Sequence, residues 1–150
     1  MGRYITEVKQ LGFVTDSIEK SIEAFSRIGL ADWSPATTVS ADKGFERMVS
    51  KGKPCDFAFR CAVNNELDIE FELIEPLDDK SDYADFLKKN GGPGLHHISV
   101  DCDDIEEVQR SGHELLVQGK TAGIPFGFQY FDFRKDLGTV LEYFPAPIDE

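Results

Sequence analysis

Apolar and polar residues alternate along much of this chain, which is the pattern of β-strands with one buried face. Turn-forming residues at 51–54 (KGKP) and 64–65 (NN) separate some of these stretches. Other segments carry apolar residues at the helical period instead, and the first such stripe is Ile18, Ile22, Phe25 and Ile28. Besides a strand that begins near Gln10, the pattern predicts strands at 36–40, 45–50, 56–63, 67–74, 95–102, 115–117, 125–133 and 139–144.

A repeated strand–helix unit is the main organisational feature of the sequence. The segment QLGFVTDSIEK, which begins at residue 10, aligns without a gap on HISVDCDDIEE, which begins at residue 97, at an offset of 87 residues. In each copy an aspartate ends the strand and an acidic residue follows three positions later, as in a helix N-cap with a capping box. The pairs are Asp16 with Glu19 and Asp103 with Glu106, and the second helix carries the stripe Ile105, Val108, Gly112 and Leu115. Two similar modules are therefore expected.

A third helix and a glycine-rich segment separate the two modules. Ser81 is expected to cap this helix, which ends at Lys88-Lys89-Asn90-Gly91, and the linker GGPG at 91–94 follows. We expect one domain over residues 1–150, with module one at about 4–90 and module two at about 95–146. Each module has the order βαβββ, so the fold class is α+β with the helices against one face of the sheet.

Strand periodicity places the two adjacent histidines on opposite faces of the sheet. In strand 95–102 the apolar face is Ile98, Val100 and Cys102, so His97 lies on the other face with Ser99 and Asp101. His96 has the parity of the apolar residues, which predicts a partly buried structural role. In the matching strand of module one, Gln10 takes the place of His97.

Two glutamates extend this set of candidate metal ligands. Glu72 faces away from the apolar side of strand 67–74, and Glu142 lies between large apolar neighbours, an unfavourable place for a carboxylate without a partner. If a pseudo-twofold axis relates the modules, both glutamates converge with Gln10 and His97. Two carboxylates, an imidazole and an amide suit a divalent cation with a position left open. The other interpretation is a solvated sheet face without a common role, and spacing alone leaves both open.

Composition narrows the class of protein. The formal net charge of −12 disfavours nucleic acid and anionic membrane surfaces as partners. No apolar stretch approaches the length of a membrane span, and the three cysteines lack metal-type or redox spacing, which is typical of a reducing compartment. We therefore expect a cytoplasmic protein that acts on a small molecule.

The sequence also resembles a known family over nearly its whole length. It is similar to the vicinal oxygen chelate superfamily, which contains glyoxalase I, methylmalonyl-CoA epimerase, extradiol dioxygenases and metal-free bleomycin-resistance proteins. The segment FELIEPLDDKSDYADFLKKNGGPGLHHISVDCDDIEE at 71–107 resembles the epimerase branch. The resemblance implies two tandem βαβββ modules that form a cup-shaped mixed sheet with helices on its outer face. It also implies a homodimer.

The same resemblance implies a metal site and a reaction. The ligand positions of the family fall on Gln10, Glu72, His97 and Glu142, and the cofactor would be a divalent metal ion (Zn, Ni, Co or Mn). The combination of Gln, Glu, His and Glu resembles that of zinc-type glyoxalases, whereas epimerases usually have His and Gln at the first two ligand positions. The shared chemistry is proton removal next to a metal-bound carbonyl through an enediolate. Glu142 would be the leading base and Glu72 its partner on the other face. Asp42 falls near a second proton shuttle of epimerases and is equally suited to a turn.

The resemblance does not fix the substrate. The glutathione-binding arginine of glyoxalases falls near Val14, and FDFRKDLG replaces a His-Pro element of epimerases, although Arg134 and Lys135 keep positive charge there. We expect a metal-dependent isomerase, epimerase or lyase. One alternative is a metal-free binding or sequestering protein on the same fold. Another is an oxygen-activating dioxygenase, which Gln10 disfavours because such sites use two histidines and one carboxylate.

Overall fold

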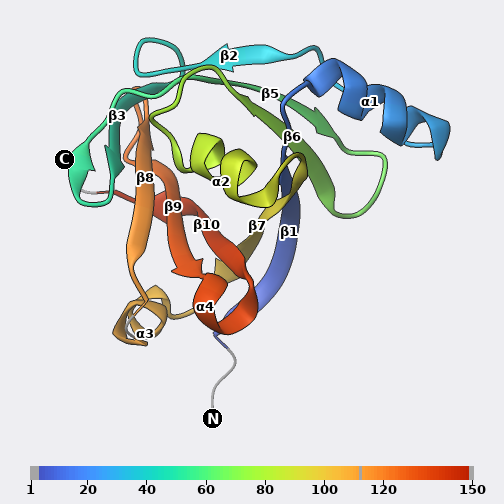
Figure 1. Ribbon diagram of the computed structural model, residues 1–150. Helices are drawn as coiled ribbons and strands as arrows, with labels where there is room; N and C mark the ends of the chain where they lie inside the picture. Colours follow the sequence, from blue (N-terminus) through green and yellow to red (C-terminus); the bar gives the residue numbers. More distant parts are fainter. Residues whose placement is uncertain (1–3, 112, 149–150) are drawn as a thin grey trace.

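In the computed structural model, which describes residues 4–111 and 113–148, ten strands form a single mixed sheet (Figure 1). Their order across the sheet is β2-β5-β6-β1-β7-β10-β9-β8-β3-β4. The strands are β1 (Ile5–Val14), β2 (Thr37–Val39), β3 (Phe45–Ser50), β4 (Lys53–Pro54), β5 (Phe59–Asn64), β6 (Glu70–Pro76), β7 (Gly94–Cys102), β8 (Leu115–Thr121), β9 (Phe126–Phe133) and β10 (Thr139–Pro147). The helices are α1 (Ile18–Arg27), α2 (Asp82–Asn90), α3 (Ile105–Arg110) and α4 (Arg134–Leu137).

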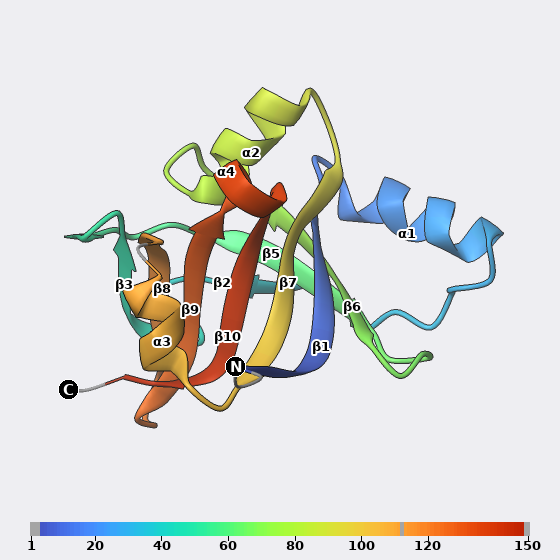
Figure 2. The same ribbon diagram turned by 90° about the horizontal axis from the view of Figure 1, so that it is seen from below.

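The sheet curls into a half-barrel around a central antiparallel pair of strands, β1 and β7 (Figure 2). β6 lies parallel to β1 on one side of this pair, and β10 lies parallel to β7 on the other. β5 and β9 then continue the sheet as antiparallel neighbours of β6 and β10. This arrangement is symmetric about the β1–β7 pair, so each module supplies half of the concave face. The predicted α+β class and the cup-shaped sheet of two modules are confirmed.

Helix α1 covers the outer face of the first module. Ile18 is buried there with Ala62 and Leu73, and the partly buried residues packed on them are Phe13, Ile22, Phe25, Trp33 and Ala36. Ile18, Ile22 and Phe25 thus turn toward the sheet as the helical period predicts, whereas Ile28, the last residue of the predicted stripe, caps the helix and is exposed.

Both predicted aspartate caps were wrong by one residue. The N-cap of α1 is Ser17 rather than Asp16, and its side chain accepts a hydrogen bond from the backbone N–H of Lys20. For α3, Oδ1 of Asp104 rather than of Asp103 accepts a hydrogen bond of 2.9 Å from the backbone N–H of Glu107. The two caps shift in the same direction, so they remain equivalent residues of the repeat.

Helices α2 and α4 lie together at one end of the half-barrel, because Arg134 of α4 reaches Asp82 at the start of α2 at 3.2 Å. Ser81 caps α2 as predicted, and Gly91 ends it in a left-handed conformation with φ of 74°. Unlike α1, α2 packs toward the concave face, where Tyr83 is buried. The cluster on this face also contains Val14, Met48, Phe59, Phe128, Tyr130 and Val140.

The β3–β4 hairpin lies on the side of the second module. β2 pairs with β5 near one edge of the sheet, whereas β3 pairs with β8 near the other, so the chain crosses between the edges over residues 40–44. Met48 of β3 is buried, and the ring of Phe45 packs edge to face on Phe128. Residues of the first module therefore help to fill the second half of the cup, which strand periodicity alone does not predict.

The second helix is shorter than its pattern predicts. α3 ends at Arg110 rather than near residue 113, and β8 extends to Thr121 rather than to 117. Gly112 of the predicted stripe lies outside the described residues. Among the helices of the described segments, none has the length and apolar character that crossing a membrane requires.

Candidate active site

The four predicted ligand residues converge on the concave face at the centre of the sheet. They come from the neighbouring strands β6, β1, β7 and β10. Gly12 of β1 lies between two of them, since it pairs with Glu72 of β6 on one side and with His97 of β7 on the other. Nε2 of His97 lies 3.3 Å from Oε1 of Gln10. The same nitrogen lies 3.6 Å from Oε1 of Glu72 and 3.9 Å from Oε1 of Glu142. One ring nitrogen thus has three side-chain oxygens around it.

A β-bulge in β7 sets the direction of both adjacent histidines. Where β1 advances from Gly12 to Phe13, its partner on β7 changes from His97 to Leu95, which leaves His96 as an extra residue. The two imidazoles lie on the same side, with 2.9 Å between their Nδ1 atoms, and both are fully buried. Our predictions that they face opposite sides and that His96 is only partly buried were therefore wrong. Parity fails here because a bulge interrupts strict alternation.

Glu70 orients the side chain of Gln10. Nε2 of Gln10 donates a hydrogen bond of 2.6 Å to Oε1 of Glu70, and this leaves Oε1 of Gln10 directed toward His97. Side-chain amides bind metal ions through oxygen. The orientation therefore presents the atom that a metal would need.

Burial dominates the electrostatics of the two carboxyl groups. It raises the pKa of Glu72 to about 8, and the neighbouring charge of Glu70 adds to the effect. It raises the pKa of Glu142 to about 7, a shift that His97 opposes and the charge of Glu72 increases. Burial also lowers the pKa of His97, which keeps its imidazole neutral at pH 7. A bound cation would oppose both rises, because it favours the ionised form of a neighbouring carboxyl group.

Two buried tyrosines support Glu142. The hydroxyl groups of Tyr83 and Tyr130 are hydrogen-bonded at 2.7 Å. Tyr130 and Ser99 are hydrogen-bonded to Glu142, and these bonds limit the rise of its pKa. The ring of Tyr130 also lies against that of His97, with 4.8 Å between the ring centroids. Tyr130 is thus in contact with two of the four candidate ligands.

The donor set fits a divalent metal ion in its chemistry, although its spacing is wide. Ligand atoms held at about 2.1 Å from a metal lie roughly 3.0–3.4 Å from one another. The separations from His97 Nε2 to the two carboxylates, 3.6 and 3.9 Å, are a few tenths of an ångström larger. Among residues 4–111 and 113–148, no three His, Cys, Asp or Glu side chains form a complete metal cluster. To bind the same ion as His97, the oxygens of Glu72 and Glu142 would have to lie a few tenths of an ångström closer to its Nε2 atom.

A cavity of about 510 Å³ opens on this group of residues. Gln10, Glu72, Ser99 and Glu142 reach its surface, while His97 is fully buried beneath it. Its aromatic lining residues are Phe45, Phe59, Tyr83, Phe128, Tyr130 and Phe144. Lys9, whose Nζ donates to the carbonyl oxygen of Phe144, also borders it. The cavity thus combines an aromatic wall with a polar side that includes the carboxyl groups of Asp68, Glu70, Glu72 and Glu142.

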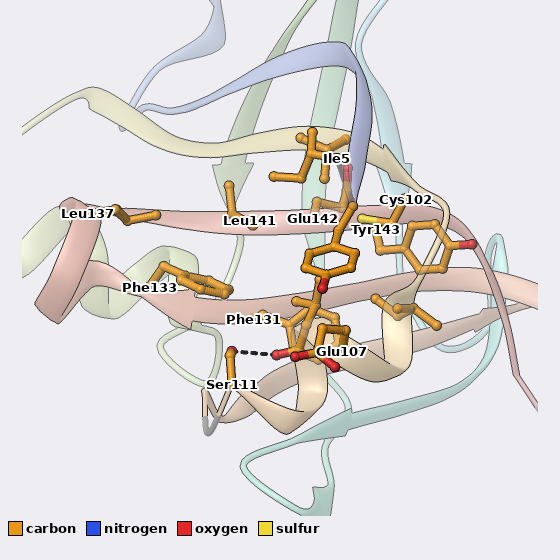
Figure 3. Close-up of a pocket in the computed structure, with 14 residues that line it drawn as sticks. Ile5, Cys102, Glu107, Ser111, Phe131, Phe133, Leu137, Leu141, Glu142 and Tyr143 are labelled. Carbon is orange, nitrogen blue, oxygen red and sulfur yellow. Dashed lines mark hydrogen bonds between the residues drawn. The ribbon is translucent and has the colours of Figure 1, made fainter. Parts of the chain in front are cut away.

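A second cavity of about 390 Å³ lies between α3, β9 and β10 (Figure 3). Its lining is mostly apolar and includes Phe131, Phe133, Leu141 and Tyr143. Of the four candidate ligands only Glu142 touches it. We therefore place the candidate site in the first cavity.

Asp42 does not join the other candidate residues. It lies on an exposed turn between β2 and β3 and is not among the residues that line the first cavity. Arg134, the positive charge noted before the last strand, is engaged by Asp82 and Asp132 within the protein. Sequence reasoning missed Asp82, because nothing in the spacing of a helix start indicates which distant side chain it will meet.

Comparisons with known proteins agree with this fold. Residues 9–125 match the model of the Glyoxalase/Bleomycin resistance protein/Dioxygenase superfamily. Over 42 residues (28% of this chain and 25% of the relative) the chain is 43% identical to the mitochondrial methylmalonyl-CoA epimerase of Dictyostelium discoideum. Over 55 residues (34% of this chain and 41% of the relative) it is 34% identical to the ethylmalonyl-CoA/methylmalonyl-CoA epimerase of Cereibacter sphaeroides. The matched segments thus span well under half of these relatives.

Solved structures extend the likeness to the whole fold. The methylmalonyl-CoA epimerase of Mycobacterium tuberculosis superposes with a TM-score of 0.65 at 18% identity, over 98% of this chain and 93% of that one. A methylmalonyl-CoA epimerase in complex with methylmalonyl-CoA and NH4+ gives a TM-score of 0.61 at 17% identity, over 93% of both chains. At this identity the likeness concerns the fold alone. Together with the family match over most of the chain, it establishes that the protein belongs to the Glyoxalase/Bleomycin resistance protein/Dioxygenase superfamily.

Proposed function

We propose that this protein is a divalent-metal-dependent epimerase that moves a proton at a carbon atom next to a carbonyl group. The observation that carries the proposal is the placement of two buried carboxyl groups, Glu72 and Glu142, around one imidazole at the base of a cavity. They come from the last strands of the two modules, on opposite sides of the central strand pair. Epimerisation needs a base on each face of the reacting carbon, and this arrangement supplies two.

Gln10, Glu72, His97 and Glu142 would hold the metal ion, with Zn, Ni, Co and Mn as the candidates. When bound, the metal would stabilise the negative charge that develops on the carbonyl oxygen of the substrate. Gln10 and neutral His97 serve only to bind. Each carboxylate can act as a base only if it loosens from the metal when substrate enters.

The substrate that we propose is a short-branched acyl-CoA of the methylmalonyl type. The two curated relatives described above are named as epimerases of such thioesters. The aromatic walls of the cavity suit the apolar part of an acyl group, and Lys9 at its border offers a positive charge to a carboxylate or phosphate. From the family and the absence of disulfide-type cysteine spacing we also infer a cytoplasmic homodimer.

Hydrogen exchange tests the proposal directly. The metal-stripped protein is reloaded with Zn, Ni, Co or Mn in turn and incubated with methylmalonyl-CoA in D2O, and deuterium at the α-carbon is measured by mass spectrometry. We expect exchange with at least one loaded form and none above background with the stripped form. Glu142→Gln should abolish exchange with one of the two epimers and the interconversion of both. Glu75→Gln is the matched control, because Glu75 lies on the same strand and pairs with Arg60 on the other face. Absence of exchange in every form shown to contain metal would contradict the proposal.

The second candidate function is metal-free binding of an apolar small molecule. The wide ligand spacing and the aromatic cavity favour it, since an uncharged Glu142 and Glu72 could simply hydrogen-bond a ligand. Equilibrium dialysis against the four metals separates the two functions, because a sequestering protein of this kind would take up none of them. The hemithioacetal of methylglyoxal and glutathione, assayed alongside the acyl-CoA, distinguishes a lyase from an epimerase.

A further inference from the structure

The cavity of about 390 Å³ beside α3, called here the outer cavity, opens on the outer face of the second module (Figure 3). Val100 and Leu141 line it from the sheet and Val108 lines it from the helix. Val100 and Leu141 are next in sequence to Ser99 and Glu142, whose side chains lie on the concave face. α3 has six residues, whereas α1, which covers the outer face of the first module, has ten. The shorter helix covers less of the sheet.

The strand registers relate the two modules by a twofold axis. Phe13 of β1 pairs with Leu95 of β7, while Val100 of β7 pairs with Val8 of β1. Val100 follows Phe13 by 87 residues, and Leu95 follows Val8 by 87 residues, which is the offset of the sequence repeat. Val100 thus occupies in the second module the position that Phe13 occupies in the first.

The same symmetry relates the neighbouring strands β6 and β10. Phe71 of β6 pairs with Leu11 of β1, and Leu141 of β10 pairs with Ile98 of β7, which is 87 residues after Leu11. Leu141 is therefore the counterpart of Phe71. Both counterparts, Val100 and Leu141, line the outer cavity.

In the first module an aromatic ring occupies this position. The ring of Phe25 in α1 packs on those of Phe13, Phe71 and Trp33, with ring centroids 5.6, 5.9 and 5.4 Å apart. The residue 87 positions after Phe25 is Gly112, which lies outside the described residues. The outer cavity therefore lies where the symmetry of the fold places an aromatic ring, and the repeat of the second module has a glycine at the matching sequence position.

The charges at the outer cavity favour an uncharged occupant. Among the described residues that line it, only Glu107 and Glu142 have ionisable carboxyl groups, and none is a lysine or an arginine. Glu107 accepts a hydrogen bond of 2.5 Å from Arg110, and Glu142 lies beside His97 on the concave face. Most of the remaining lining is aromatic or aliphatic, and a ring such as that of Phe131 can make edge-to-face or offset contacts with a further ring.

We propose that the outer cavity is a binding site for a small uncharged aromatic molecule, whose ring takes the position that Phe25 occupies in the first module. Its volume of about 390 Å³ is larger than the roughly 150 Å³ at which an engineered apolar cavity already binds benzene. Ile5 and Leu137, which also line it, are 39% and 63% exposed, so the cavity has an entrance from solvent. The inference does not rest on the proposed function, because it concerns the other face of the sheet.

Methyl NMR of metal-stripped protein tests the site with benzene as the probe. The ¹³C-methyl signals of Val108 and Leu141 report on the outer cavity, and that of Ile74 reports on the first cavity, which it lines. The signals are assigned with Val108→Ile, Leu141→Ile and Ile74→Val. We expect saturable ring-current shifts at Val108 and Leu141, with a Kd on the order of 1 mM. Shifts at Ile74 alone, or at none of the three, would overturn the inference.

Substitutions in α3 separate the cavity from the surface around it. Val108→Phe adds a ring to the wall of the cavity, and Glu106→Phe is the matched control, because Glu106 lies on the same helix and is not among the lining residues. With binding measured at Leu141, we expect Val108→Phe to weaken it about tenfold or more and Glu106→Phe to leave it within about twofold of wild type. Unchanged binding in Val108→Phe would contradict the proposal. If that variant does not fold, Val100→Phe, which introduces the first module's residue, makes the same comparison.

Two further probes decide the chemistry of the ligand. Benzoate carries the same ring with a negative charge, and we expect it to bind about tenfold more weakly than benzene or less, because the cavity wall offers it no cation. Equal binding of the two would refute an uncharged ligand, and binding of cyclohexane without benzene would assign the cavity to an aliphatic group. A second copy of the chain over this face would exclude benzene, and sedimentation at the same protein concentration identifies that outcome, which also overturns the proposal.

Discussion

Gly12 leaves the space in which the imidazole of His97 lies. A Cβ atom added to Gly12 would be 2.1 Å from both Cε1 and Nε2 of His97, a distance that no side chain could accept without moving. Gly12 pairs with His97 of β7 on one side and with Glu72 of β6 on the other, so it lies between these two candidate ligands. The glycine is explained by this close approach of a ring to the backbone.

Substitution of Gly12 by alanine is expected to displace His97 and weaken metal binding. Because the added methyl group meets the ligating nitrogen itself, we expect a loss of affinity of about 10–100-fold, comparable to the loss of an outer partner of a metal ligand. Isothermal titration of the metal-stripped protein measures it. In a His97→Ala background the same substitution should have little further effect, because the ring that it displaces is gone. An additive loss in the double variant would mean that Gly12 acts through the backbone rather than through His97.

The two glutamates are expected to act on opposite faces of the substrate carbon. Glu72→Gln and Glu142→Gln should each lose epimerisation, while each retains deuterium exchange with one of the two epimers, because the remaining carboxylate still reaches its own face. The epimer that exchanges should differ between the two variants. Incubation of each pure epimer in D2O, with metal content measured in the same samples, makes the comparison. Loss of exchange with the same epimer in both variants would show that one carboxylate does all of the proton transfer.

Periodicity and the repeat were sufficient to predict the central sheet and its four inward-facing residues. Glu72 and Glu142 lie in regularly paired segments, and Gln10 and His97 lie in the regular stretch between two bulges of the β1–β7 pair, so alternation gives the face of each side chain. The contacts that orient them could not be predicted in this way. His96 lies at a bulge, and a bulge depends on the register between two strands distant in sequence.

The outer contacts depend on tertiary packing rather than on local pattern. Asp82 reaches His96 only because α2 lies across the end of the half-barrel, and Arg134 reaches Asp82 only because α4 lies beside it. β3 likewise pairs with β8, although the opposite edge of the sheet would offer it the same backbone hydrogen bonds. The strand propensity of residues 45–50 is satisfied equally well at either edge, so the sequence pattern does not predict which edge β3 joins.

In metal-stripped protein, the free energy of unfolding should fall as the pH rises from about 6.5 to about 8. The folded-state pKa of Glu142, about 7, and that of Glu72, about 8, are both above the value of 4.5 for an unperturbed carboxyl group. Burial lowers the pKa of His96 from 6.5 to about 4, and this opposes the effect of the two glutamates below pH 6.5. Above pH 6.5 the folded protein binds more protons than the unfolded chain, and the stability that the protonated glutamates contribute is lost as the pH passes their folded pKa values.

Glu142→Gln should flatten this dependence and stabilise the stripped protein at pH 8, on the order of 2 kcal/mol. Urea unfolding at a series of pH values measures both effects, with Glu75→Gln as the control that should keep the wild-type slope. Added metal should stabilise the wild type more than Glu142→Gln, since ligand binding to the folded state raises its stability. A wild-type stability that rises between pH 6.5 and pH 8 would contradict the assignment of raised pKa values to the two carboxyl groups.

Removal of the hydroxyl groups of the buried pair Tyr83 and Tyr130 should reduce the free energy of unfolding by different amounts. With Glu142 ionised, Tyr130 donates to it and Tyr83 donates to Tyr130. Tyr130→Phe therefore leaves the hydroxyl of Tyr83 without an acceptor and removes a donor from Glu142. We expect this to cost about 1–3 kcal/mol of folding free energy. Tyr83→Phe leaves only an acceptor lone pair of Tyr130 unused and should cost less. The double variant should cost less than the sum, because no hydroxyl remains unpaired. Denaturant unfolding at pH 8 ranks the three, and a larger loss for Tyr83→Phe than for Tyr130→Phe would show that the hydrogen bonds run in the opposite direction.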